Sequence, residues 1–110
     1  MKVDQRGHTT IIKNTQGRTN EFLKKLEHEH HSFKEQNLII DLLHDKELCM
    51  EDIKSFSEII KNHTSGKKSM VLVAENINHN DVPKKITVVP TILEAHDIIE
   101  LDEIERDLGF

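Results

Sequence analysis

Two apolar runs separated by a helical pattern constrain this chain more than any other feature. The first run, LIIDLL at residues 38–43, is broken only by Asp41, and the second, MVLVA at residues 70–74, is unbroken. Short runs of this kind are typical of strands that are buried on both faces of a sheet. Between the runs, a helical period places on one face Cys49, Ile53, Phe56, Ile60 and His63. The sequence therefore predicts a parallel strand–helix–strand unit in which the two runs are neighbouring strands.

Weaker patterns precede this unit. Residues 2–4 and 9–13 predict two short strands that form a hairpin. A polar loop then leads to a helix that Thr19 or Asn20 can cap. Its apolar stripe consists of Phe22, Leu26, His30 and Phe33. This part of the chain therefore adds two strands and a surface helix.

A last strand and a helix follow the unit. Residues 86–89 predict the strand, and Thr91-x-x-Glu94 is a capping box that starts the helix. The apolar face of this helix consists of Ile92, Ala95, Ile98 and Ile99. The whole chain therefore predicts an α/β fold with the order β-β-α-β-α-β-β-α and a mostly parallel sheet.

Composition limits the class of protein. At 110 residues the chain predicts one domain, and 35% hydrophobic residues predict a thin core of two layers. A single cysteine excludes an internal disulfide and fits a reducing compartment. No apolar run approaches the length of a membrane span, and the first residues lack the apolar core of a signal peptide. We therefore expect a cytoplasmic protein without membrane association.

The charge of the chain is concentrated at its C-terminal end. From Thr91 onward seven acids accompany a single base, Arg106, so this part carries −6 and the remainder +1. Nucleic-acid binding requires a basic patch. The charge pattern therefore argues against a nucleic-acid partner.

The apolar face changes after Glu100. Leu101, Ile104 and Leu108 would point away from Ala95 and Ile99 on one unbroken helix. We therefore interpret residues 101–110 as a separate, acidic amphipathic extension of a domain that spans residues 1–100. Its apolar edge consists of Leu101, Ile104, Leu108 and Phe110. We expect this edge to dock on the body of the chain or on a second copy, as a homodimer; a frayed tail is the alternative.

The order of elements, with LIIDLL, KKSMVLVAENI and ITVVPTILEAHDII, resembles the STAS domain of sulfate transporters and anti-sigma factor antagonists. The resemblance covers about nine-tenths of the chain and rests on pattern more than on rare residues. It implies the antagonist-like fold and a role in binding and regulating another protein.

In the antagonist branch of that family, an Asp-Ser-Ser/Thr-Gly motif carries a phosphorylated hydroxyl. Aligned on Asp41, this motif falls on Cys49-Met50-Glu51-Asp52, which contains neither a hydroxyl nor a glycine. The resemblance therefore implies a partner-binding loop without the phosphorylation switch. Glu51 either supplies a fixed negative charge at a helix start or is an ordinary first-turn acid.

The chain is also similar to short bacterial proteins that end in EIERDLGF-like tails and are called ribonuclease Z. That activity requires an H-x-H-x-D-H loop of the metallo-β-lactamase type. The nearest string, His28-Glu29-His30-His31, lacks the acid–histidine pair. This likeness implies a hydrolase or nuclease-associated protein by name alone.

Other candidate sites have simpler explanations. His28 and His31, or Glu27 and His31, are close enough on a helix to chelate one metal ion, but a catalytic zinc needs a third protein ligand, so we expect exposed histidines. Cys49 would need His44 as a base, whereas its period places it in the core beside Ile53. We therefore expect no cofactor, no metal and no enzymatic activity. The leading hypothesis is a STAS-like protein-binding module, and the alternative is a hydrolase or nuclease-associated protein.

Overall fold

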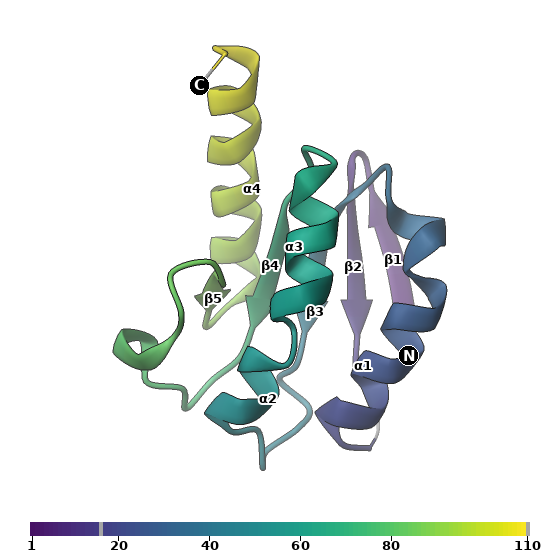
Figure 1. Ribbon diagram of the computed structural model, residues 1–110, viewed down its shortest axis with the longest axis vertical. Helices are drawn as coiled ribbons and strands as arrows, with labels where there is room; N and C mark the ends of the chain where they lie inside the picture. The colour runs from purple at the N-terminus through teal and green to yellow at the C-terminus, as the bar shows by residue number, and fades with distance from the viewer. Residues whose placement is uncertain (16, 110) are drawn as a thin grey trace.

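Five strands form one mixed sheet in the computed structural model, which describes residues 1–15 and 17–109 (Figure 1). The strand order is β1-β2-β3-β4-β5; β1 pairs antiparallel with β2, and the other neighbours are parallel. The strands are β1 (Lys2–Arg6), β2 (Thr9–Lys13), β3 (Asn37–Asp41), β4 (Met70–Val73) and β5 (Val88–Val89). The predicted α/β class and the parallel pairing of the two apolar runs, β3 and β4, are confirmed.

The apolar runs are continuous because both faces of the sheet are covered. Every residue of β3 and β4 is buried. Ile40 and Leu72 face one layer of helices, whereas Ile39, Val71 and Val73 face the other. This double coverage is the usual environment of parallel strands.

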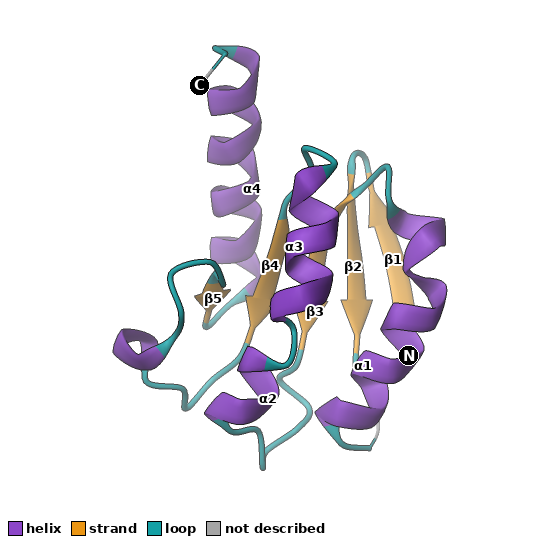
Figure 2. Ribbon diagram, viewed as in Figure 1, coloured by secondary structure: helices purple, strands orange, loops and turns teal. Residues whose placement is uncertain are grey.

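Helices lie on both faces (Figure 2). One face is covered by α1 (Thr19–Glu29), its 3-10 continuation η1 (His30–Phe33), α2 (Met50–Lys54) and α3 (Ser57–Ser65). The other face is covered by α4 (Ile92–Asp107), which packs through Ala95 and Ile99. A short 3-10 turn, η2 (His79–Asp81), lies between β4 and β5. The prediction of two layers was therefore wrong, because the apolar second face of β3 and β4 requires a third layer to cover it.

The single helix predicted after Cys49 is two helices. Between α2 and α3, the hydroxyl of Ser55 donates to the carbonyl oxygen of Glu51 at 2.8 Å, and that of Ser57 donates to Lys54 at 2.7 Å. Such side-chain bonds to backbone compete with helix continuation. The apolar period survives the interruption because Phe56 is fully buried at the junction.

The start of α1 is capped from a distant loop. Arg18 precedes the helix, and the Asp45 carboxylate accepts hydrogen bonds from the Thr19 amide at 3.0 Å and the Thr19 hydroxyl at 2.8 Å. Its other oxygen accepts from the Glu47 amide at 3.0 Å. Neither Thr19 nor Asn20 is therefore the cap that the sequence suggested. Asp45 instead joins the loop after β3 to α1.

The final helix is unbroken from Ile92 to Asp107. The hydroxyl of Thr91 accepts from the Glu94 amide at 3.1 Å, so the predicted cap is present. Residues 101–107 continue the same helix, and Figure 2 shows its last turns extending past the ends of the strands. The prediction of a separate piece from residue 101 was therefore wrong, because a reversal of the apolar face does not itself interrupt backbone hydrogen bonding.

We expect the substitution Asp45→Ala to lower the free energy of unfolding by about 1–3 kcal/mol, because it removes a helix cap and leaves the buried Thr19 without its acceptor. Urea unfolding measures the change. The control Glu47→Ala removes an exposed ion pair with Arg18 and should cost about 0.5 kcal/mol or less. Equal effects of both substitutions would show that Asp45 does not cap α1.

Candidate functional site

The loop after β3 is the site that the sequence favoured, and its acids hold the loop together. Asp41 is buried, and its carboxylate accepts from the Leu43 amide at 3.0 Å. Burial alone raises the pKa of Asp45, but the hydrogen bonds from Thr19 and Glu47 and the charge of Arg18 outweigh it, so this pKa is lowered. Both carboxylates therefore serve as hydrogen-bond acceptors for the backbone around them.

The segment Cys49–Asp52 begins α2 at the end of this loop. Cys49 is exposed, and its amide donates to the Asp52 carboxylate at 3.1 Å, with its Sγ 3.4 Å from the same oxygen. The prediction of a core cysteine was wrong, because the extended backbone of Cys49 lies outside the helix and Ile53 is the first buried residue within it. Glu51 is exposed in the first turn, and Met50 is half-buried. This segment therefore presents a thiol and acids to solvent at the edge of the fold.

A buried pair of histidines joins η1, the continuation of α1, to α3, and sequence reasoning missed it. Nε2 of His30 lies 2.8 Å from Nδ1 of His63, and Nε2 of His63 lies 2.8 Å from the carbonyl oxygen of Gln36. The two rings meet edge to face with centroids 5.0 Å apart. The sequence did contain a signal for this pair, because both histidines stand at apolar positions of their helical periods. A buried histidine needs a hydrogen-bond partner, and two in the same layer of helices can supply it to each other.

The hydrogen bonds determine which ring nitrogens carry protons. A carbonyl oxygen only accepts, so Nε2 of His63 donates to Gln36 and its Nδ1 is the acceptor. Nε2 of His30 must then donate to that Nδ1. The pair is satisfied when both rings are neutral, and a second proton on His63 would place two N–H groups against each other.

Burial keeps the pair neutral. It lowers the pKa of His63 to about 4, although the bond to Gln36 acts in the opposite direction; the charges of His30 and Lys68 lower it further. Burial, Lys34 and His31 also lower the pKa of His30. The pair is therefore a neutral tie between helices at ordinary pH.

A hollow of about 310 Å³ lies beside the pair. It is lined by His30, Lys34, Glu35, Asn62, His63, Ser65 and Gly66. The hydroxyl of Ser65 donates to the carbonyl oxygen of Asn62 at 2.8 Å, so it is already engaged. The hollow therefore contains a neutral histidine pair and an engaged hydroxyl.

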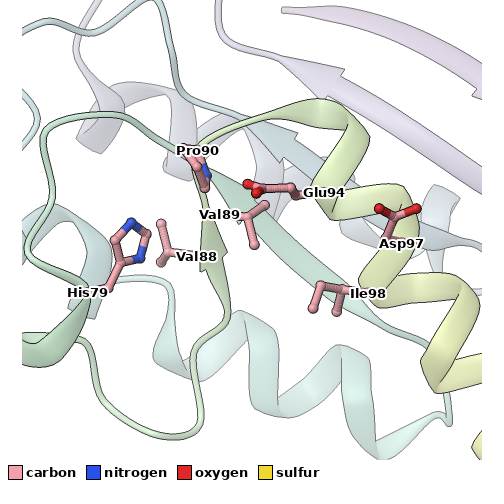
Figure 3. Close-up of a pocket in the computed structure, with 7 residues that line it drawn as sticks. All are labelled: His79, Val88, Val89, Pro90, Glu94, Asp97 and Ile98. Atoms are coloured by element: carbon pink, nitrogen blue, oxygen red, sulfur yellow. The ribbon is translucent and has the colours of Figure 1, made fainter.

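A larger groove of about 520 Å³ lies between β5 and α4. Its lining residues are His79, Val88, Val89, Pro90, Glu94, Asp97 and Ile98. Figure 3 shows Val88 and Val89 on the strand side, with the carboxylates of Glu94 and Asp97 on the helix side. The groove combines an apolar wall with an acidic rim, which suits a basic and apolar ligand surface.

A polar clamp holds the C-terminal half of α4 to the sheet. Arg106 donates to the Ser69 hydroxyl at 3.2 Å and to Oδ1 of Asn37 at 3.3 Å, and the Ser69 hydroxyl donates to Asp102 at 2.7 Å. The Ser69 amide donates to the same Asn37 oxygen at 2.9 Å. Asn37 and Ser69 are buried at the start of β3 and β4. Polar residues of α4 therefore face the body.

The apolar edge of the same segment faces solvent. Leu101, Ile104 and Leu108 are exposed, and Phe110 lies outside the described residues. The prediction that this edge docks on its own body was therefore wrong for the three described residues, because the clamp turns the opposite side of α4 toward the sheet. Docking on a second copy stays a prediction.

The metal candidates on α1 and η1 do not belong to a group of three ligands among the described residues. Glu27, His28 and His31 are exposed, and residues 1–15 and 17–109 contain no group of three or more metal-ligating side chains. His44 is also exposed, and Cys49 has Asp52 rather than His44 as its hydrogen-bond partner. The described part of the chain therefore offers neither a metal centre nor a thiol–imidazole pair.

Comparison with models of known protein families finds no match, and comparison with curated proteins finds none. None of the helices in the described part of the chain combines the length and apolar composition that crossing a membrane requires.

The buried histidines predict a fall in stability in mild acid. The lowered pKa means that the unfolded chain takes up a proton on His63 near pH 6.5, whereas the folded chain resists it down to about pH 4. Stability is therefore highest above pH 6.5 and decreases as the pH falls toward 4, by about 3 kcal/mol from His63, and the lowered pKa of His30 adds to the decrease. Urea midpoints measured across this range test the prediction.

Two matched substitutions isolate the pair. His63→Gln keeps a donor and an acceptor but cannot titrate, so it should make the decrease between pH 6.5 and 4 smaller by the contribution of His63. His28→Gln removes an exposed histidine and should leave the decrease unchanged. Asp45 does not interfere, because its lowered pKa affects stability only below its ordinary value of 3.8. An unchanged slope in His63→Gln would contradict the assignment.

Proposed function

We propose that this protein is a small, non-enzymatic, cytoplasmic STAS-like module that binds and regulates a protein partner without a phosphorylation switch. The five-stranded mixed sheet, with β3 leading into the loop before α2, supports the resemblance, whereas the layer that α4 forms on the second face departs from the two-layer fold expected from the sequence. The partner-binding loop in this proposal is Cys49–Asp52, the segment that aligns with the family's phosphorylation motif.

The observation that carries the proposal is that the buried acids of the loop, the Cys49 thiol and the buried histidines are all engaged in structural hydrogen bonds. Asp41 bonds to Leu43, and Asp45 bonds to Thr19. Cys49 bonds to Asp52, while His30 and His63 bond to each other. Groups held in this way position loops and helices. The exposed loop and helix surfaces are then what the protein offers to another molecule, which supports binding rather than catalysis.

Labelling through the single cysteine tests this function. Cys49 is exposed in the proposed loop, so a maleimide photocrosslinker on it should capture a specific protein from a lysate of the source cells. The substitution Glu51→Lys should reduce the captured band at least about tenfold, since one well-placed charge reversal exceeds about 1.4 kcal/mol. The control carries the crosslinker at an exposed position elsewhere, with Cys49→Ser and Lys84→Cys. Equal capture by this control would show that the loop is not the binding site.

We also expect the loop to stay unmodified by a kinase of the anti-sigma type. Cys49–Asp52 offers no hydroxyl, and the nearest hydroxyls, on Ser55 and Ser57, are bonded to backbone carbonyl oxygens. Mass spectrometry after incubation with kinase and ATP measures the outcome. Stoichiometric phosphate on either serine would show that a switch exists one helical turn further on.

An RNA-cleavage assay with purified protein and added Zn²⁺, Mn²⁺ or Mg²⁺ tests the alternative class. The proposal predicts no cleavage above a blank. Metal-dependent cleavage that purifies with the protein would overturn the non-enzymatic assignment.

A further inference from the structure

The outer face of α4 carries an exposed stripe of apolar residues, one at the start of the helix and three toward its end. Leu93, Leu101, Ile104 and Leu108 are 72%, 57%, 49% and 66% exposed. Because each residue turns a helix by about 100°, these four and Asp97 lie within an arc of about 80°. Their steps of four and three residues match the seam of a coiled coil. The stripe is therefore a helix-binding pattern with one acid in its seam.

Exposed acids flank this stripe on both sides. Glu100 and Asp107 follow one edge, and Glu94 and Glu105 follow the other. In a pair of helices, the flanking positions of one helix face those of its partner and select it by charge. Two copies of α4 would place acids against acids in either orientation. The charge pattern therefore disfavours self-pairing through this face and argues against the homodimer that the sequence led us to expect.

We propose that the stripe on α4 binds an amphipathic helix of a protein partner whose apolar seam is flanked by Lys and Arg. The inference rests on the proposed protein-binding function and adds a second binding surface, separate from the Cys49–Asp52 loop, together with the chemistry of its occupant. A basic residue facing Asp97 would complete the seam. Anionic membranes and nucleic acids carry the same sign of charge as the stripe and are repelled by it.

Contacts on the opposite side of α4 direct this stripe toward solvent. Asp102 and Arg106, on the opposite side of α4, hold the helix to Ser69 and Asn37, so the stripe faces outward. The last turns extend past the sheet, as Figure 1 shows, and leave room for a second helix. The groove beside β5 shares Glu94 and Asp97 with this face and lengthens the acidic surface. A partner helix therefore meets a preformed site, which lowers the entropy lost on binding.

A defined peptide pair tests the proposal. The probe is a synthetic 21-residue helix (roughly three heptads) with Leu and Ile in the seam and Lys at the flanking positions; its control has Glu in place of Lys. Fluorescence anisotropy with labelled peptide at 50 mM and 300 mM NaCl measures binding to the full chain. We expect the Lys peptide to bind at least about tenfold tighter than the Glu peptide, with affinity falling at high salt.

Two variants locate the binding on α4. The double substitution Leu101→Gln and Ile104→Gln removes two exposed seam residues without changing charge and should weaken the Lys peptide at least about tenfold. Val3→Gln removes an exposed apolar residue of β1 and should leave binding unchanged. Circular dichroism melts check that both variants fold.

The outcomes separate this proposal from the one on which it rests. Undiminished binding by the double variant, equal binding of the two peptides, or no binding of the Lys peptide would overturn the assignment of α4. If the protein forms a dimer at neutral pH and the double variant does not, the assignment would also be overturned, because a second copy would then occupy the stripe on α4. A partner captured through Cys49 in any of these cases would leave the protein-binding function intact.

Discussion

The burial of β3 and β4 on both faces is the constraint on which the rest of the structure depends. Each residue of these strands lies in the interior, so their side chains alternate between two separate apolar clusters. A chain of this size cannot leave either cluster open to water, because apolar area exposed there would cost about 25 cal/mol per Å². Three helices therefore cover one face, and α4 alone covers the other. Because the inner side of α4 packs on the sheet, only its outer side is available to other molecules.

Polar contacts between residues distant in sequence determine where the helices stop and which way they face. Asp45 holds the start of α1, the His30–His63 pair joins the end of α1 to α3, and Arg106 with Asp102 holds the end of α4. Apolar packing alone would allow a helix to slide or rotate, since hydrophobic attraction has no direction. Hydrogen bonds at the helix ends have direction, and they orient the surfaces between them.

The sequence predicted the strands well and the helix ends poorly. Continuous apolar runs identify buried strands directly, and the spacing of Thr91 and Glu94 identified one cap. The capping role of Asp45 was missed because Asp45 and Thr19 are 26 residues apart, and a local sequence pattern cannot indicate such a distant pair. The break at Ser55 and Ser57 was missed because the apolar period continues through it. The same period wrongly placed Cys49 in the core. Cys49 has an extended backbone before the helix begins, so the helical period does not determine the direction of its side chain. The histidine pair required tertiary contacts to recognise, although both members were placed on buried faces.

The amide nitrogen of Asn37 is buried without a hydrogen-bond partner among the described residues. The side-chain oxygen of Asn37 accepts hydrogen bonds from Ser69 and Arg106. Exchanging the positions of this oxygen and the nitrogen would therefore lose both bonds. The buried residues of α4, Ala95 and Ile99, lie in its first half, so polar contacts such as the one from Arg106 hold its last turns to the sheet. Local opening at this end therefore requires less free energy than opening of β3 and β4. Amide hydrogens in the last turns of α4 should consequently exchange with solvent well ahead of those in the central strands, and a partner bound there would slow that exchange.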